Sequence, residues 1–182
     1  MSRFATERLR TRYLASRVAL RRLLAERTGV DVPHRLVLVQ APGGKPRLEG
    51  SASRLTFSLA RSDDIAVVAL ADAVEVGVDV EIWHPLFECD AFRQAVLSLA
   101  ERRAVDALPA AERPDAVQRL WVRKEAIVKA RGTGFTASPA SIDAGGVEPR
   151  WADALPRPGA ARWADVPVPC ARAAVAIAWA SP

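Results

Sequence analysis

The stretch VEVGVDVEI, residues 74–82, alternates branched apolar residues with acidic residues and glycine, and this period of two is typical of a β-strand. Asp79 and Glu81 therefore emerge on one face, and the branched residues take the other. The ordinary interpretation is a half-buried strand that shows its polar face to water. The alternative is that a cation removes the repulsion between the two carboxylates, and oxygen ligands of this kind suit magnesium. The stretch alone leaves both interpretations open.

The segments around this strand predict a mixed α/β protein. Runs of branched residues predict further strands at 35–40, 55–59, 65–70 and 173–180. Helical periodicity predicts helices at 5–27, 88–108 and 112–131, with proline or glycine near several of their ends. The three strands between 55 and 82 follow one another closely, so we expect them to form an antiparallel meander. The loop APGGKPRLEG, residues 41–50, predicts a tight turn around Lys45.

The composition narrows the class of protein. The chain has 182 residues, of which 50% are hydrophobic and 26% charged, so it can bury a core as one domain or as two small lobes. No window approaches the roughly 18 apolar residues of a membrane span, and arginines interrupt the first 20 residues, which argues against a secretory signal. Two cysteines cannot form a disulfide framework. We therefore expect a cytoplasmic protein that does not enter a membrane.

The net charge of +5 is concentrated near the N-terminus. Residues 1–27 hold eight arginines against Glu7 and Glu26, a net +6, so the remainder sums to −1. Such a patch can attract nucleic acid, an anionic membrane, a phosphorylated ligand or an acidic protein. After Tyr13 the predicted helix has no aromatic residue for stacking on bases, which argues against a nucleic-acid binder.

Only three of the 26 basic residues are lysine, namely Lys45, Lys124 and Lys129. In the segment 120–135, LWVRKEAIVKARGTGF, Trp121, Glu125 and Lys129 fall on one face of a helix, with Lys124 beside them. A surface ion pair between Glu125 and Lys129 is the ordinary interpretation of that spacing. Because this chain otherwise uses arginine, two lysines in one turn favour a specific role. A solvated turn is likewise the commoner meaning of the GGKP sequence, and a phosphate contact is the alternative.

These motifs together resemble a known family. GVDVEIWHP (77–85) and WVRKEAIVKARGTGF (121–135) are similar to the two signatures of the Sfp-type 4'-phosphopantetheinyl transferases, roughly GxD(I/V)E and W(S/T)xKE(A/S)xxKxxGxG. Upstream, the family's helix, GKP turn and FNxSHS strand resemble, in the same order, SRVALRRLLAERTGV (16–30), GGKPRL (43–48) and FSLARSDDIAVVAL (57–70). The resemblance extends from about Tyr13 to Phe135.

The resemblance implies a transferase that moves the phosphopantetheine arm of coenzyme A onto a serine of an acyl or peptidyl carrier protein and releases 3',5'-ADP. Asp79, Glu81 and Glu125 match the family's magnesium-binding carboxylates, and Glu125, or a water that it orients, is the implied base. Lys124 and Lys129 match residues that hold the pyrophosphate. They would stabilise the charge that builds up as the phosphoanhydride breaks. Glu125 and Lys129 are thus the implied catalytic residues.

The resemblance assigns further contacts to coenzyme A. Lys45 matches a lysine at the nucleotide end, and Arg17 matches an arginine that reaches the 3'-phosphate. Glu101 falls loosely where members place another acidic residue near the metal. Where the family has Ser-His, this chain has Ala60-Arg61; because arginine binds phosphate bidentately, we expect Arg61 to take over the histidine's contact.

The implied fold is α/β, with two similar lobes, 1–76 and 77–182, related by a pseudo-twofold around a cleft that holds the cofactor and the metal. The N-terminal lobe is expected to be abbreviated by some thirty residues relative to many members. The implied partner is an acidic carrier protein of fatty acid, polyketide or nonribosomal peptide synthesis, and we expect a monomer. The alternative is a non-catalytic homologue that binds coenzyme A or the carrier without needing Glu125.

Overall fold

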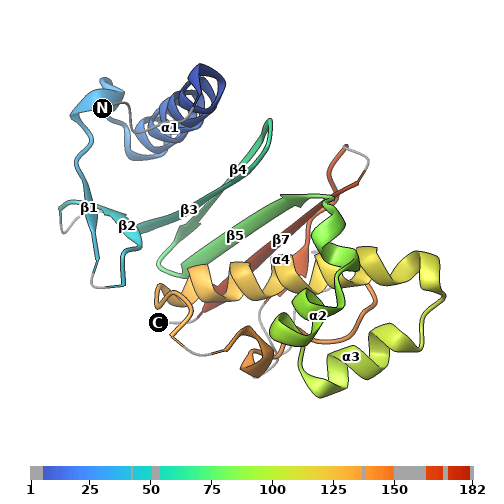
Figure 1. Cartoon of the computed structure of the whole chain (residues 1–182). Helices are drawn as coiled ribbons and strands as arrows, with labels where there is room; N and C mark the ends of the chain where they lie inside the picture. The colour runs from blue at the N-terminus through green and yellow to red at the C-terminus, as the bar shows by residue number, and fades with distance from the viewer. Residues whose placement is uncertain are drawn as a thin grey trace.

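The computed structural model describes residues 6–41, 43–50, 54–136, 138–149, 163–169 and 172–180. Its helices are α1 (Glu7–Thr28), α2 (Asp90–Val96), α3 (Leu99–Asp106) and α4 (Arg113–Arg131). Its strands are β1 (Leu38–Gln40), β2 (Pro46–Leu48), β3 (Leu55–Ser62), β4 (Ile65–Asp72), β5 (Glu75–Ile82), β6 (Trp163–Asp165) and β7 (Ala173–Ala180). Short 3-10 turns cover Pro33–Arg35, Pro85–Glu88, Ala110–Glu112 and Pro139–Ser141. The mixed α/β class predicted from the sequence is confirmed (Figure 1).

The strands form two antiparallel hairpins and one three-stranded sheet. β1 pairs with β2, β3 pairs with β4, and the sheet has the order β5-β7-β6 with antiparallel neighbours. The predicted antiparallel meander is therefore wrong at its third strand, because β5 pairs with β7 and not with β4. The connection at Ala73 has a left-handed φ of 58°, and its N–H donates to Arg54 O at 2.8 Å. The short connection between β4 and β5 predicts that these two strands form a hairpin, but the structure does not have this hairpin.

Serine side chains join β5 to β3. The N–H of Val78 donates to Ser58 Oγ at 3.1 Å, and the N–H of Ile82 donates to Ser62 Oγ at 3.0 Å. Both contacts step four residues along each strand in the same direction, so β3 and β5 run side by side and parallel. β5 therefore connects the β3–β4 hairpin to the sheet β5-β7-β6, as Figure 1 shows. The expected lobe boundary between residues 76 and 77 falls inside this strand.

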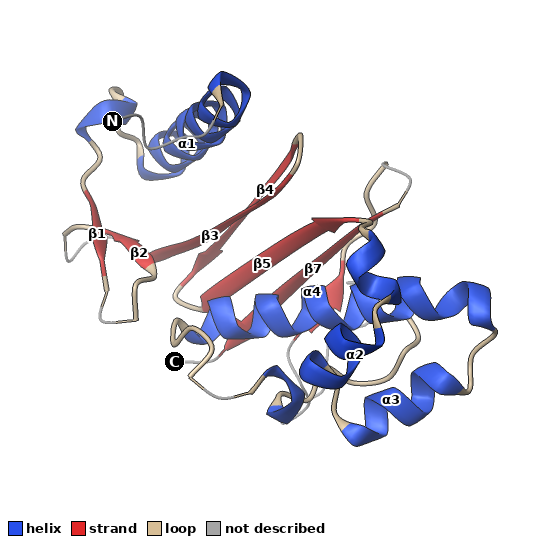
Figure 2. Cartoon of the chain, viewed as in Figure 1, coloured by secondary structure: helices blue, strands red, loops and turns tan. Residues whose placement is uncertain are grey.

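Both faces of β5 are covered. Val76, Val78 and Val80 are each 1% exposed and pack with the β3–β4 hairpin and Val175. On the opposite face, α4 crosses the sheet (Figure 2). A Cβ placed on Gly77 would lie 2.1 Å from the carbonyl oxygen of Ala126, so only glycine allows α4 to come this close. The face that carries Asp79 and Glu81 is thus turned towards α4 rather than water.

The helices differ from the sequence prediction at one place. The predicted helix 88–108 is two helices, because Ser98 caps α3 in a capping box with Glu101. The other two predicted helices are confirmed, and both end at glycines with left-handed φ, Gly29 at 70° and Gly132 at 68°. Within the described residues, no helix has the length and apolar character needed to cross a membrane.

We predict that Gly77→Ala lowers the free energy of unfolding by at least about 2 kcal/mol, because the added methyl meets helix backbone that cannot yield. Gly146→Ala is the matched control, since a Cβ there has nothing within 4 Å. Its effect should stay within about 0.5 kcal/mol. Urea unfolding measures both, and a Gly77→Ala protein as stable as the control would contradict the described packing.

Candidate functional site

One cavity collects most of the residues singled out in the sequence. Its volume is about 740 Å³, and its walls come from α1, the β1–β2 hairpin, β3 and the C-terminal half of α4. Among its lining residues are Arg17, Lys45, Arg61, Glu125 and Lys129. These five are separated by up to 112 positions along the chain (129 − 17), and folding brings them to one site. The cavity therefore lies where the N-terminal segments meet α4.

Of the three predicted metal-binding carboxylates, Glu125 lines this cavity, whereas Asp79 and Glu81 are not among its lining residues. Asp79 is 4% exposed, and burial raises its pKa to about 7 against the opposing attraction of Lys129, with Glu81 and Glu125 adding to the rise. Burial also raises the pKa of Glu125, and the charge of Glu81 adds to that shift. The three carboxylates predicted from the sequence are therefore close enough for the charge of Glu81 to raise the pKa values of both Asp79 and Glu125. The ordinary interpretation, a polar face in water, is wrong for Asp79, because α4 covers it.

The carboxylates already have protein partners. Lys129 Nζ, on a side chain that is 33% exposed, donates to Asp79 Oδ1 at 2.5 Å, and Ser62 Oγ donates to Glu81 Oε2 at 2.8 Å. Lys129 thus pairs with Asp79 and not with Glu125, its partner in the ordinary interpretation of the helix spacing. Asp79 Oδ2 is buried without a hydrogen-bond partner. In the part of the chain that the structure describes, no three His, Cys, Asp or Glu side chains already form an ion-binding group.

A pair of arginines shares an aromatic ring at the α1 side of the cavity. The guanidinium carbon of Arg61 lies 4.9 Å from the centroid of the Tyr13 ring, and that of Arg17 lies 5.9 Å from it. Tyr13 also lines the cavity. Two cations thus lie beside one ring, which is a suitable surface for an anion.

Lys45 lines the cavity, but its ammonium group is turned into the protein. Nζ donates to Glu75 Oε2 at 2.8 Å, to Val76 O at 2.8 Å and to Ala130 O at 3.2 Å. These three acceptors use all the hydrogens of the ammonium. The contact with Ala130 also places a cation at the C-terminal end of α4, where the helix dipole favours it. Lys45 therefore ties the GGKP turn to β5 and α4.

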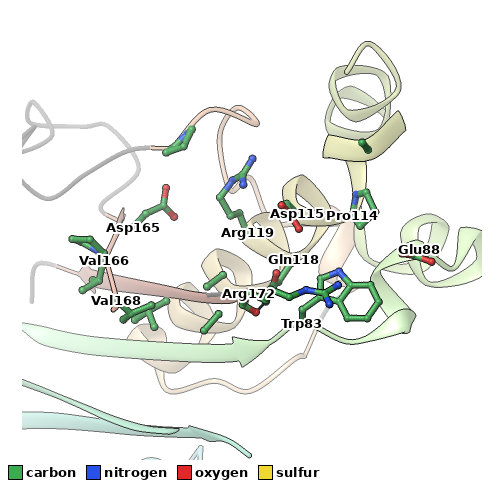
Figure 3. Close-up of a pocket in the computed structure, with 16 residues that line it drawn as sticks. Trp83, Glu88, Pro114, Asp115, Gln118, Arg119, Asp165, Val166, Val168 and Arg172 are labelled. Atoms are coloured by element: carbon green, nitrogen blue, oxygen red, sulfur yellow. Dashed lines mark hydrogen bonds between the residues drawn. The ribbon is translucent and has the colours of Figure 1, made fainter. Parts of the chain in front are cut away.

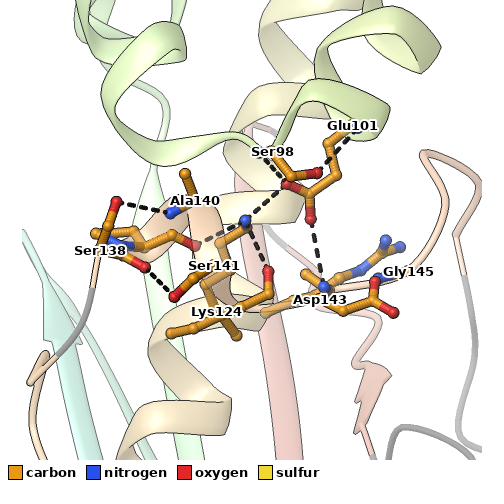
Figure 4. Close-up of polar contacts among 12 residues, drawn as sticks. Ser98, Glu101, Lys124, Ser138, Ala140, Ser141, Asp143 and Gly145 are labelled. Carbon is orange, nitrogen blue, oxygen red and sulfur yellow. Dashed lines mark hydrogen bonds and ion pairs between the residues drawn. The ribbon is translucent and has the colours of Figure 1, made fainter.

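Lys124 does not line the cavity, which differs from the phosphate contact predicted for it. It is 0% exposed, and Nζ donates to Glu101 Oε2 at 2.6 Å, to Pro139 O at 3.0 Å and to Ile142 O at 2.9 Å (Figure 4). Glu101, predicted loosely to lie near the metal, also accepts from the N–H groups of Ser98 and Ala144. This buried network joins α3, α4 and the segment 138–144. It serves the fold rather than the cavity.

Two further cavities flank the same helix. A smaller one of about 480 Å³ is lined by Glu81, Ser62, Trp83, Phe92 and Trp121 among others, and it shares no lining residue with the first cavity. The other, shown in Figure 3, lies beside Gln118, Asp165 and Arg172 and contains none of the residues predicted from the sequence.

Several site residues carry no signal in the sequence. Ser62 reaches Glu81 only because β3 lies beside β5. Phe135 lines the main cavity and stacks on Trp121, with ring centroids 5.6 Å apart. Tyr13 reads as one apolar position of an amphipathic helix. The spacing Trp121-Glu125-Lys129 was the one available signal for this wall, and it gave the correct helix face for Glu125 and Lys129.

Comparison with known proteins points to one family. Residues 75–155 match the 4'-phosphopantetheinyl transferase superfamily. Relatives include the 4'-phosphopantetheinyl transferase AcpT of Salmonella typhimurium, 38% identical over 127 residues (68% of this chain, 59% of the relative). AcpT of Escherichia coli is 34% identical over 68% of this chain and 58% of its own length. The 4'-phosphopantetheinyl transferase HetI of Nostoc is 29% identical over 74% and 57%, respectively.

The chain belongs to the 4'-phosphopantetheinyl transferase superfamily. The matched regions span less than two thirds of the length of these relatives, 59% for the first of them.

We predict that Lys124→Met lowers the free energy of unfolding by about 3 kcal/mol, because the carboxylate of Glu101 is left buried without its counter-charge. Glu101→Gln combined with Lys124→Met removes both charges, so the double variant should be more stable than Lys124→Met alone. Thermal or urea unfolding compares the two. A double variant less stable than Lys124→Met would show that the ion pair is not the source of the loss.

The raised pKa of Asp79 predicts a pH dependence of stability in the presence of a chelator. Between pH 3.8, the ordinary pKa of an aspartate, and about pH 7, folded Asp79 binds a proton that the unfolded chain releases, so its contribution to stability falls as the pH rises through this window. Asp79→Asn removes this term. The stability of Asp79→Asn relative to wild type should therefore rise from pH 5 to pH 7, by up to about 1.4 kcal/mol per pH unit. If the difference in stability between Asp79→Asn and wild type did not change over that pH range, the raised pKa of Asp79 would be wrong.

Proposed function

We propose that this chain transfers the 4'-phosphopantetheine group of coenzyme A to a serine of an apo acyl or peptidyl carrier protein, releasing 3',5'-ADP. One observation carries the proposal: a single cavity is lined by Arg17 and Arg61 and also by Glu125 and Lys129, and Lys129 donates to Asp79. Coenzyme A has a phosphomonoester and a pyrophosphate, and the cavity offers cations for each. Membership of the superfamily supports the same reaction.

In the proposed complex, Arg17 and Arg61 bind the 3'-phosphate and Lys129 lies beside the pyrophosphate. Arg61 is exposed and lies on the cavity wall, which supports its taking the place of the family histidine. Lys45 contributes its aliphatic stem to the wall beside the nucleotide, because its ammonium is held by Glu75 and two carbonyls. Lys124 is left out of the phosphate contacts, since its ammonium is enclosed with Glu101.

The proposed chemistry is a displacement at phosphorus. The hydroxyl oxygen of the carrier serine bonds to the phosphorus of the phosphopantetheine group, and the phosphoanhydride bond to 3',5'-ADP breaks. Glu125 takes the serine proton, directly or through a water. Burial raises the pKa of this carboxyl, which brings its basicity closer to neutral pH. Lys129 stabilises the negative charge that develops on the leaving phosphate.

Magnesium fits the donors present at the carboxylate group. Asp79, Glu81 and Glu125 offer only oxygen ligands, and among the described residues Oδ2 of Asp79 has no hydrogen-bond donor, which buried oxygens normally have. These three residues would hold the ion, which neutralises pyrophosphate charge when bound. Lys129 and a divalent ion are both attracted by Asp79, so the carboxylate has two cationic partners available.

The proposal includes a two-lobe arrangement, 1–76 and 77–182, related by a pseudo-twofold, with the cavity between the lobes.

The arginines of α1 would give a positive field towards an acidic carrier protein. The smaller cavity, which is lined by Glu81, offers the carrier serine a separate approach to the carboxylates. We further propose that the protein acts as a monomer in the cytoplasm.

Intact mass spectrometry tests the proposal with coenzyme A, Mg2+ and several apo carrier proteins. We expect the mass of phosphopantetheine to be added to at least one carrier, and Glu125→Gln to reduce the rate by at least about 100-fold while leaving coenzyme A binding within about threefold. Arg22→Ala, an exposed arginine of α1 outside the cavity, is the charge control.

Binding of coenzyme A by the wild type without transfer to any carrier would favour the non-catalytic homologue. Transfer at the wild-type rate by Glu125→Gln would overturn the assignment of that residue as the base.

A further inference from the structure

Most arginines of α1 are already engaged by protein groups. Arg8 and Arg12 bind the carboxylates of the β3–β4 turn, and Arg27 binds Asp72 at 3.3 Å. Arg21 donates to two backbone carbonyls, at 3.1 and 2.7 Å. These contacts fasten both ends of the helix to the β3–β4 hairpin and to the chain that follows the helix. They also remove these arginines from the set that can bind an anion.

Arg17 and Arg61 differ from this set. Across the described ranges, neither has a carboxylate within ion-pair distance. Both guanidinium groups instead lie near the ring of Tyr13, at 4.9 Å for Arg61 and 5.9 Å for Arg17. Arg61 also donates to Oγ of Ser16 at 3.5 Å, and Ser16 lies about one turn after Tyr13 in α1. In the part of the chain that the structure describes, the Arg61 side chain thus contacts α1 at Tyr13, which lines the cavity, and at Ser16.

An exposed arginine has many rotamers, and ordering it on binding costs free energy. An aromatic ring under the guanidinium reduces that cost, because the cation is attracted to the ring face while its N–H groups remain free at the plane's edge. The free edge is the part that binds phosphate bidentately. Tyr13 can thus hold Arg61 ready without neutralising it, which a carboxylate in the same place could not do.

We propose that Tyr13 is a positioning residue that orients Arg61, with Arg17 beside it, towards the phosphomonoester of the nucleotide, and so sets the preference for coenzyme A over dephospho-coenzyme A. This inference rests on the proposed function. It assigns a role to a ring that would otherwise serve as packing. The apolar contacts of α1 are made by Leu20 and Leu24, both 0% exposed, so Tyr13 is half-buried beside that core rather than at its centre.

Isothermal titration without Mg2+ or carrier protein tests the inference, because it measures binding and not transfer. We expect Tyr13→Leu to raise the Kd for coenzyme A about three- to fivefold while changing the Kd for dephospho-coenzyme A less than about twofold. Tyr13→Phe keeps the ring and should keep the wild-type ratio of the two Kd values. Arg61→Ala should lose about tenfold for coenzyme A alone.

The double variant Tyr13→Leu/Arg61→Ala completes the cycle. If the ring acts through Arg61, the double variant loses no more than about twice the factor of Arg61→Ala, well below the product of the single effects. Arg22→Ala removes the same charge from an exposed position of α1 and should leave the ratio unchanged. Because both ligands need the same fold, partial unfolding would shift both Kd values together and not their ratio.

Three outcomes would overturn the inference: a Tyr13→Leu protein with the wild-type ratio, a Tyr13→Phe protein that loses as much as Tyr13→Leu, or multiplicative effects in the double variant. Failure of the wild type to bind coenzyme A at all is a different result, and it would count against the proposed function itself.

Discussion

The close approach of α4 to β5 determines most of this structure. It requires Gly77, because any Cβ there would overlap the helix backbone at Ala126 and Ala130. With the helix at this distance, Asp79 is buried against Lys129, while Glu81 on the same face of β5 stays half-buried. The same contact places Glu125 close enough to be affected by the charge of Glu81. The electrostatics of the site are thus a consequence of one missing side chain.

The chain uses lysine at only three positions, and the structure gives these lysines structural contacts as well as a place near the site. Each is paired with an acid: Lys45 with Glu75, Lys124 with Glu101 and Lys129 with Asp79. For the first two, the ammonium also donates to two backbone carbonyls, an arrangement that suits a compact group with three donors better than a planar guanidinium. Only Lys129 combines partial exposure, at 33%, with a place in the cavity.

The sequence predicted the parts of the site that follow from local periodicity. The strand at 74–82, the helix ending at Gly132 and the shared face of Glu125 and Lys129 are all local patterns, and the structure has them. Pairing partners are not local. The sequence therefore predicted a meander, although β5 pairs with β7 about a hundred residues further on in the chain. The enclosure of Lys124 is likewise not local, since it depends on α3 and the segment 138–144, whereas the resemblance implies a contact of Lys124 with the pyrophosphate.

A crystal structure with coenzyme A and Mn2+ tests the central claim most directly. The account predicts the 3'-phosphate beside Arg17 and Arg61, the pyrophosphate beside Lys129, and an anomalous manganese peak at Asp79. A nucleotide bound in the cavity of Gln118 and Arg172, or manganese remote from Asp79, would contradict it.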